Sequence, residues 1–188
     1  MFMGGGAVAT TLSALPTASW SNPVFEGETR RVNLHNLHTG ESAGVTYWEK
    51  GEYLPDAMAE VNHVLRDFRT GEVHPIRPEL MDLLHQLSQR VGVSAPFQVI
   101  SGYRSPQTNA SLARPGSGVA HHSLHMQGMA IDIRAPGVDL ASLHRAALSM
   151  GGGGVGYYPS SDFVHVDVGP VRHWAMNGRA ARGGDARG

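Results

Sequence analysis

Two short segments place ionisable side chains inside runs of branched aliphatic residues, and this pattern constrains the fold more than any other. Residues 129–133 carry Asp132 between two isoleucines, and residues 163–168 carry His165 in a run of valines. Side chains alternate between the two faces of a strand, so each segment has an aliphatic face and a polar face. Because a buried charge is costly without a partner, we expect two paired strands whose polar side chains enter one cleft.

His125, Asp132 and His165 together have the composition of a catalytic zinc site. Such sites usually supply three protein ligands and leave one position open for water. His125 precedes the first strand, and Gly128 allows the chain to turn between His125 and Asp132. The chain has 11 histidines, and a single histidine is more often a surface or hydrogen-bonded residue than a ligand. The joint pattern nevertheless predicts one Zn²⁺ per chain, bound by these three residues.

The order of motifs also carries a family resemblance. The pattern Ser123-x-His125-x-x-Gly128-x-Ala130-x-Asp132, followed by His165, resembles the signature of the LAS-type zinc peptidases. That group includes lysostaphin-like enzymes, D-alanyl-D-alanine carboxypeptidases and the hedgehog N-terminal domain. The stretches SGYRSPQTN (101–109), GGVGYYP (153–159) and FVHVD (163–167) are most similar to the YcbK/MepK-like murein endopeptidases. The likeness extends from about residue 31 to residue 174.

This resemblance implies a single α+β domain of the hedgehog or D-alanyl-D-alanine peptidase type. A small antiparallel sheet would carry the metal site, with helices packed on one side. The implied activity is that of a zinc-dependent murein endopeptidase that hydrolyses the peptide cross-links of the bacterial cell wall. Two alternatives stay open: a D-alanyl-D-alanine carboxypeptidase that acts on stem peptides, and a zinc-bearing binding module without hydrolysis. The resemblance does not select which bond is cut.

Several further residues acquire candidate roles from the resemblance. Arg104 follows a buried strand and would bind substrate and stabilise the oxyanion, although a salt bridge closing the strand end would also explain it. Ser123 would bind substrate or hold its loop. The other substrate-binding candidates are Tyr103 and Tyr157, with Tyr158 as an alternative to Tyr157.

Two aspartates compete for the role of catalytic base. Asp162 lies three residues before His165, which matches an acidic-x-x-His spacing in several relatives. Asp167 lies two residues after His165, on the same expected strand face. Either carboxylate could take a proton from the attacking water or instead orient an imidazole ring. We expect Asp162 to be the base.

Composition limits the classes of partner. The chain of 188 residues has 41% hydrophobic and 16% charged residues, as expected for one globular domain. A formal net charge of −1 gives no reason to expect nucleic acid or an anionic membrane as partner. Without cysteine, disulfides and thiolate metal sites are excluded. We expect a monomer.

The ends of the chain differ in composition from its middle. Residues 1–19 carry no charge and are rich in small residues, which is typical of the later part of a secretory signal or of a disordered tail. The segment is too short and too weakly apolar for a transmembrane helix. We therefore expect export to the periplasm or cell envelope, a peptidase domain over residues 20–175 and a frayed tail over residues 176–188.

Hydrophobic periodicity predicts the remaining elements. They are a hairpin over 30–48, helices over 56–69 and 78–91, a strand over 97–100, a short helix over 108–113, a helix that starts at Asp139, and a strand over 155–158. Residues 114–120 would form a loop at one wall of the cleft. The helix after Asp139 would connect the two metal-bearing strands.

Overall fold

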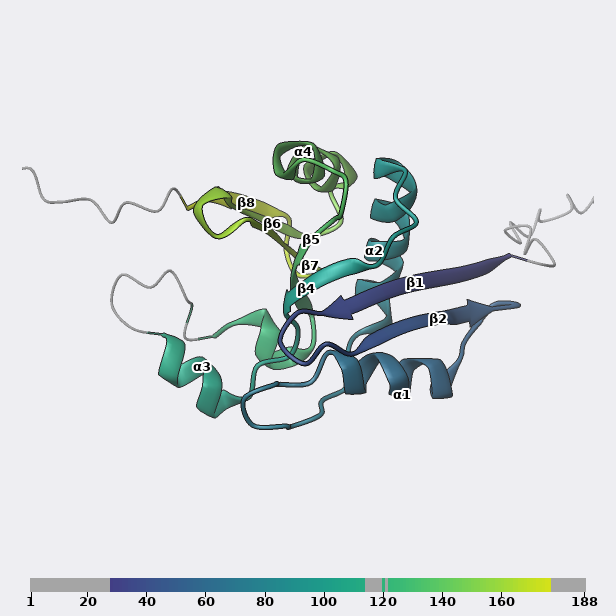
Figure 1. Cartoon of the computed structure of the whole chain (residues 1–188), viewed down its shortest axis with the longest axis horizontal. Helices are drawn as coiled ribbons and strands as arrows, with labels where there is room; N and C mark the ends of the chain where they lie inside the picture. The colour runs from purple at the N-terminus through teal and green to yellow at the C-terminus, as the bar shows by residue number, and fades with distance from the viewer. Residues whose placement is uncertain (1–27, 114–119, 121, 177–188) are drawn as a thin grey trace, which may run out of the picture.

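The computed structural model describes residues 28–113, 120 and 122–176 (Figure 1). The predictions for residues 1–19, for most of the loop 114–120 and for residues 177–188 lie outside this part of the chain. Its strands form one eight-stranded sheet in the order β3-β2-β1-β4-β5-β7-β6-β8. The strands are β1 (Thr29–Asn36), β2 (Ser42–Glu49), β3 (Glu52–Tyr53), β4 (Phe97–Ser101), β5 (Ala130–Arg134), β6 (Gly154–Tyr158), β7 (Phe163–Asp167) and β8 (Arg172–Ala175). The helices are α1 (Pro55–Val64), α2 (Pro78–Val91), α3 (Pro106–Leu112) and α4 (Leu140–Met150), with short 3-10 turns η1 (Leu124–Gln127) and η2 (Pro159–Ser161).

Helix α2 has the bounds that its pattern predicted, and α4 begins where its N-cap predicted. In α2, proline occupies the first turn and Gly92 closes the helix in the left-handed conformation. The Asp139 side chain accepts a hydrogen bond from the Ser142 backbone N–H and caps α4. Figure 1 shows α2 and α4 side by side, and the two helices contact each other directly.

Helix α1 is shorter than the sequence predicted, because it ends at Val64 rather than Arg69. The next helical turn would need the carbonyl oxygens of Val64 and Leu65 as acceptors. The Asn36 side-chain amide instead donates to the Val64 oxygen at 2.8 Å. The Tyr103 backbone N–H donates to the Leu65 oxygen, also at 2.8 Å. Tertiary hydrogen bonds to two other parts of the chain therefore replace the last predicted turn.

In the centre of the sheet, β4-β5-β7-β6, every pairing is antiparallel, as are the pairings of β1 with β2 and of β2 with β3 at one edge. Two parallel pairings, β1 with β4 and β6 with β8, extend this centre on either side. The α+β class with a metal-bearing antiparallel region is confirmed. The sheet is larger and more mixed than the small antiparallel sheet that the sequence predicted.

The two faces of the central strands have different environments. On one face, Ile131, Ile133, Val164 and Val166 join a core that also includes residues of α1, α2 and α4. Asp132 of β5 lies directly opposite His165 of β7 in the antiparallel register. Residues that are directly opposite share a face, so Asp132 and His165 both lie on the face away from this core.

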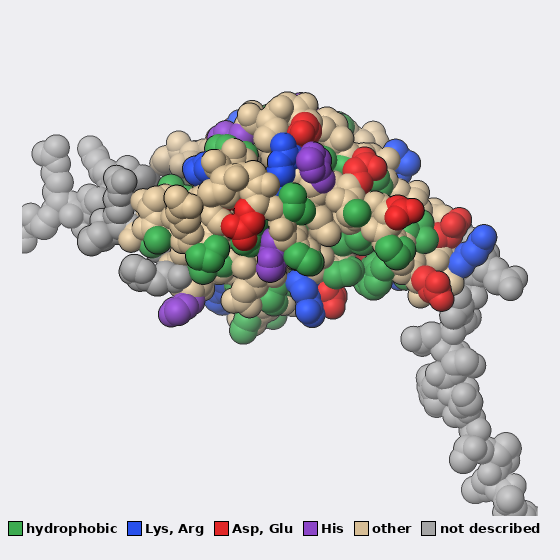
Figure 2. All heavy atoms as spheres, turned by 90° about the horizontal axis from the view of Figure 1, so that it is seen from below, with side chains coloured by type: hydrophobic (Ala, Val, Ile, Leu, Met, Phe, Trp, Pro, Cys, Tyr) green, Lys and Arg blue, Asp and Glu red, His purple; other side chains and the backbone are tan. Residues whose placement is uncertain are grey.

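The surface carries interspersed charges. On the face shown in Figure 2, acidic and basic side chains of the described residues lie among one another, in keeping with the small net charge of −1. None of the helices in the described part of the chain has the length and apolar character needed to cross a bilayer.

Candidate metal centre

The three predicted ligands meet in one buried cluster. The Nε2 atom of His125 lies 3.2 Å from Nδ1 of His165 and 3.3 Å from Oδ1 of Asp132. His165 Nδ1 lies 2.9 Å from the same Asp132 oxygen. A tetrahedral zinc ion with bonds of about 2.0–2.1 Å holds its ligand atoms roughly 3.3–3.4 Å apart. The three atoms therefore need only small shifts to bind one ion.

Both imidazole rings have their other nitrogen bound elsewhere. His125 Nδ1 lies 2.7 Å from the carbonyl oxygen of Gly102, and His165 Nε2 lies 3.0 Å from Oδ2 of Asp167. Because a carbonyl and a carboxylate only accept, these outer nitrogens carry the protons of the neutral rings. The inner nitrogens then present lone pairs to each other and to the Asp132 carboxylate. This donor set fits a cation, and metal-binding histidines commonly have such outer partners.

The protein environment favours the cation-binding charge states of His125 and Asp132. Burial lowers the pKa of His125. Burial opposes ionisation of Asp132, but its interactions with His125 and His165 outweigh burial and hold the pKa of Asp132 well below its ordinary value. Asp132 is therefore ionised in the folded protein, as a metal-binding carboxylate must be. Burial lowers the pKa of His165, but the hydrogen bonds with Asp132 and Asp167 outweigh burial and raise it, so a metal ion must compete with a proton for this ring.

His125 reaches the cluster from η1, a single 3-10 turn that precedes β5. The Ser123 side chain accepts from the His125 backbone N–H and caps this turn. Gly128 ends the turn with a φ of +64°, a conformation in which other L-residues are strained. A Cβ atom at Gly128 would also collide with the Pro75 carbonyl oxygen. These local constraints fix where the His125 ring lies.

Arg104 lies beside the cluster and fixes Asp132. Its Nη2 donates to Oδ2 of Asp132 at 2.8 Å, and its Nε donates to the Ser101 hydroxyl at 2.9 Å. Asp132 thus uses one oxygen toward the two histidines and the other toward Arg104. This bond is the salt bridge that the alternative reading of Arg104 anticipated, and Arg104 also lines the cavity over the cluster.

Asp167 is fully buried behind His165. Its Oδ1 accepts from the backbone N–H groups of Gly154 and Gly169, each at 2.9 Å, and its Oδ2 accepts from His165. Arg172 adds two bonds, at 3.2 and 2.7 Å. Burial opposes ionisation, but the hydrogen bonds from His165, Gly154 and Gly169 outweigh it and lower the pKa of Asp167 to about 2.

Asp162 lies outside the buried cluster. Its carboxylate is 3.1 Å from Nη1 of Arg134, and 64% of its side chain is exposed. Asp162 has a φ of +54°, the left-handed conformation, at the end of η2. Its two neighbours in the chain, Ser161 and Phe163, both line the cavity over the metal ligands.

The two tyrosine candidates point away from the cavity. The Tyr103 ring stacks on His74, and its hydroxyl donates to Glu72 at 2.6 Å. Tyr157 stacks on His144 of α4. In the β6–β7 register, Gly156 lies opposite His165 and Tyr158 lies opposite Phe163. Tyr158 therefore shares the face of the metal ligands, and it is Tyr158 that lines the cavity.

A cavity of about 270 Å³ opens over the ligands. Its wall includes Arg172 and Trp174, to which the sequence analysis gave no role, together with His122 and with Tyr158, the alternative to Tyr157. Alternation along β6 could have identified Tyr158. Trp174 comes from β8, which the sequence did not predict, and it lies 5.2 Å from His165 between ring centroids. Its indole N–H donates to the Tyr158 hydroxyl at 2.8 Å.

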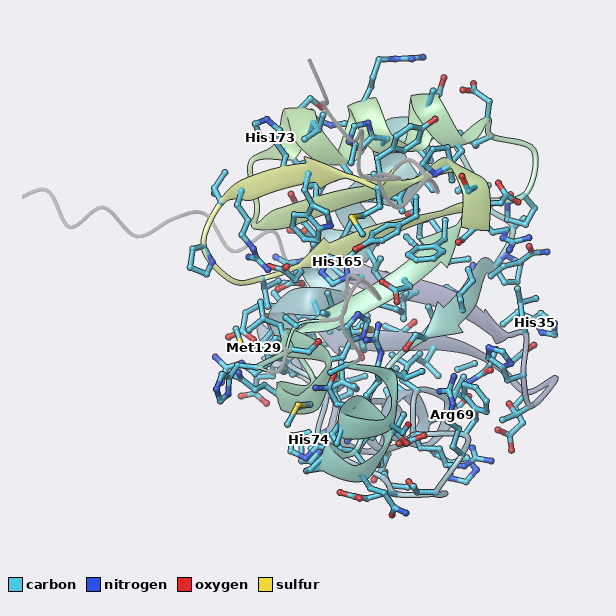
Figure 3. The ribbon with its side chains drawn as sticks, turned by 90° about the vertical axis from the view of Figure 1, so that its left-hand side faces the viewer. His35, Arg69, His74, Met129, His165 and His173 are labelled. Atoms are coloured by element: carbon cyan, nitrogen blue, oxygen red, sulfur yellow. The ribbon has the colours of Figure 1, made fainter. Side chains whose placement is uncertain are left out.

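Three other histidines lie away from the metal ligands. In Figure 3, His165 lies near the middle of the sheet, whereas His35, His74 and His173 lie toward the edges of the molecule. Among the described residues, only His125, Asp132 and His165 form a group of His and acidic side chains that could bind a metal ion. His121, the neighbour of His122, lies outside the described residues.

A buried two-histidine, one-carboxylate cluster under an open cavity, carried on an α+β fold, fits the class of metal-dependent hydrolases. Comparison with known families agrees. The family model described as Peptidoglycan L,D-endopeptidase MepK (Peptidase_M15_2) matches residues 25–174, and the chain belongs to this family.

Curated relatives give the same result. The chain is 43% identical over 169 residues to the Peptidoglycan L,D-endopeptidase MepK of Escherichia coli strain K12, covering 90% of this chain and 92% of that protein. It is 38% identical over 170 residues to a protein of Haemophilus influenzae described as "Probable peptidoglycan L,D-endopeptidase MepK", with 90% and 91% covered. No solved structure matches the chain.

Proposed function

We propose that this protein is a zinc-dependent peptidoglycan endopeptidase that hydrolyses peptide cross-links of the bacterial cell wall. Its family makes it a peptide-bond hydrolase, and its relatives are described as L,D-endopeptidases. The observation that carries the proposal is the buried cluster of His125, Asp132 and His165, in which three electron-pair donors face one another under a cavity. A substrate bond placed in that cavity would lie next to the metal position.

Zinc is the metal that we propose for this site, and the type of ligand supports it. Imidazole nitrogen and carboxylate oxygen, without any thiolate, suit zinc in a catalytic site with three protein ligands. A zinc ion bound there would acidify a water molecule and polarise the scissile carbonyl. The protein's own contribution is to present three unprotonated donor atoms, to hold both rings through Gly102 and Asp167, and to hold Asp132 through Arg104.

Asp162 is our candidate for the residue that takes the proton of the attacking water and returns it to the leaving amine. Asp167 is a poor candidate, because five donors surround it and its pKa is about 2. Asp162 has one charged partner, is exposed, and lies between two cavity-lining residues. Rotation of its side chain away from Arg134 would free a carboxylate at the cavity rim.

Substrate contacts would come from the cavity wall. Arg104 lines it and is our candidate for stabilising the oxyanion. It would have to do so while it keeps its hydrogen bond to Asp132. Ser123 also lines the cavity, although its hydroxyl already caps η1. We replace Tyr157 with Tyr158 as the candidate tyrosine, since Tyr158 is the one in the wall. We also propose that the chain is exported to the periplasm or cell envelope, where its substrate lies, and acts as a monomer.

Digestion of purified sacculi tests this function. The zinc-loaded protein should convert cross-linked muropeptide dimers into monomers, and chelation should stop the reaction. Liquid chromatography with mass spectrometry reads both products. Monomers shortened by one residue, with dimers intact, would instead identify a carboxypeptidase. Zinc binding with no product of either kind would leave only the non-catalytic module.

A further inference from the structure

Arg172 lies at the edge of the cavity, where several contacts hold its side chain. It belongs to none of the sequence motifs, and it has no role in the proposed hydrolysis. Its guanidinium carbon lies 5.1 Å from the centre of the Trp174 ring, which it covers. Its Nη1 and Nη2 donate to the two oxygens of Asp167. A Cβ atom at residue 154 would lie 2.7 Å from Nη1, so glycine at that position makes room for the guanidinium. Arg172 is therefore held in one place, although 44% of its side chain is exposed.

The guanidinium still has an unused edge. An arginine carries five N–H donors, arranged as two forks that can each grip a carboxylate. Asp167 takes the fork formed by Nη1 and Nη2, and the Pro170 carbonyl oxygen takes the other N–H of Nη1. No acceptor in the described part of the chain takes the Nε–H or the second N–H of Nη2. As far as the described residues go, the Nε–Nη2 fork is thus free in a residue that lines the cavity.

The charges of the cavity wall favour an anionic ligand. Two arginines, Arg104 and Arg172, line it, and the one carboxylate among the lining residues in the described part of the chain is that of Asp132. Asp132 is already committed to the two histidines and Arg104. A neutral peptide bond offers a carbonyl oxygen as acceptor but no negative charge to pair with the second guanidinium. A substrate that carries a carboxylate near its scissile bond does.

We propose that Arg172 is a specificity-determining residue that binds a free carboxylate of the substrate, carried by a residue flanking the scissile bond. The inference rests on the proposed function and names one feature of its substrate. The Asp167 fork and the Trp174 ring hold the guanidinium in place before substrate arrives. The Nε–Nη2 fork then makes a bidentate pair with the carboxylate at the side of the cavity formed by β8. Pre-positioning of this kind lowers the ordering cost of binding.

A purely structural role for Arg172 makes a different prediction. If Arg172 served only to hold Asp167, and through it His165, its loss would weaken zinc binding and slow the cleavage of every substrate by one common factor. A carboxylate-binding residue instead changes the ratio of rates between substrates with and without that carboxylate. The ratio separates the two roles even where both effects are present.

The experiment uses two synthetic cross-linked peptides that are identical except that the carboxylate next to the scissile bond is a carboxamide in one of them. We would measure kcat/KM for both peptides, and zinc content, with the zinc-loaded wild-type chain, Arg172→Gln, Arg172→Lys and the control Arg145→Gln. Arg145 is an exposed arginine of α4 that bonds to Ser142. The wild type and the control should prefer the carboxylate peptide by about 10–100-fold.

Arg172→Gln should remove this preference, and Arg172→Lys should keep only part of it, because an ammonium cannot form the fork. Equal wild-type rates on the two peptides overturn the inference, as does a preference that survives in Arg172→Gln or that stays undiminished in Arg172→Lys. If Arg172→Gln does not fold, the wild-type ratio and the lysine variant still decide. Failure of the wild type to cleave either peptide or sacculi, with zinc bound, counts against the proposed function instead.

Discussion

The two aspartates near His165 differ in how many donors surround them, and this difference decides which can act as a base. Asp167 accepts from the His165 ring, two backbone N–H groups and Arg172, and it is fully buried. A carboxylate stabilised in this way holds its charge and takes up a proton poorly. Asp162 pairs with Arg134 alone among the charged groups of the described residues and stays mostly exposed.

Asp162→Asn should therefore keep zinc and fold but lose kcat by about 10²–10⁴-fold, the usual contribution of a general base. Asp167→Asn should weaken zinc binding by about 10–100-fold, because His165 loses the acceptor that orients it. Parallel measurement of zinc content and turnover separates the two variants. A zinc-loaded but inactive Asp167→Asn, beside a fully active Asp162→Asn, would reverse the assignment.

At the scale of elements, the segment that links β4 to α3 is fixed to the turn after α1 by Asp67. This buried carboxylate accepts from the backbone N–H and the hydroxyl of Ser105, at 2.9 and 2.7 Å, and from the backbone N–H of Arg69 at 3.0 Å. Ser105 follows Arg104 directly in the chain. Asp67 therefore helps to place the arginine that bonds to Asp132.

The ionisation of Asp67 makes this link sensitive to pH. Burial would raise its pKa, but hydrogen bonds from Thr108, Ser105 and Arg69 outweigh burial and lower the pKa from 3.8 to about 2. A carboxylate with a lowered pKa in the folded state stabilises it fully above the unfolded value, near pH 4. That contribution is lost as the pH falls toward 2.

Asp67→Asn should thus cost about 1–2 kcal/mol of unfolding free energy at pH 7, and the difference from wild type should shrink below about pH 4. Urea unfolding followed over pH 3–7 measures it. Glu60→Gln, at an exposed position of α1, is the matched control and should change little at any pH. A constant Asp67→Asn deficit over this range would contradict a role for the ionised carboxylate.

Local sequence patterns predicted the elements whose position depends on their own residues, such as alternating side chains or the residues at helix ends. The face of Asp132 and His165 follows from alternation alone, and the bounds of α2 follow from its proline and glycine ends. The end of α1 did not follow, because Asn36 and Tyr103 compete for its last carbonyl oxygens from distant parts of the chain. Strand β8 was missed for a similar reason. This strand forms by pairing with β6, a separate segment of the chain, so its own residues do not predict it. The Trp174 ring packs in the space that Gly156 leaves.

In the candidate site, too, the sequence predicted some residues and not others. The ligands could be read from residue type and spacing, because buried His and Asp side chains need a partner. The roles of the surrounding side chains depend on direction, which spacing does not give. Tyr103 and Tyr157 lie in the right motifs, but their rings stack on His74 and His144. Arg172 has no signal in the sequence, because its relation to Asp167 and Trp174 exists only in the fold.

At the scale of the whole molecule, the metal would connect segments that are distant in the chain. His125 comes from η1, Asp132 from β5 and His165 from β7, and their three donor atoms lie 2.9–3.3 Å apart. Without a cation, these lone pairs repel one another or must share a proton. An ion that binds the folded arrangement, and not the unfolded chain, stabilises the fold by mass action.

Zinc at about 100 times its Kd should add about 2.7 kcal/mol of stability. For a chain of this size, each kcal/mol of stability raises Tm by about 2–4 °C. Zinc at this concentration should therefore raise Tm by about 5–10 °C relative to the protein from which a chelator has removed the metal. Scanning calorimetry with and without chelator measures the shift, and elemental analysis should find one zinc per chain.

His125→Ala should lose both the zinc and the shift. His35→Ala should keep both, because His35 lies far from the cluster, at the edge of the molecule (Figure 3). An unchanged Tm and no bound metal in the wild type would remove the basis for a metallopeptidase, since Gly102, Arg104 and Asp167 would then hold three ligands that bind nothing.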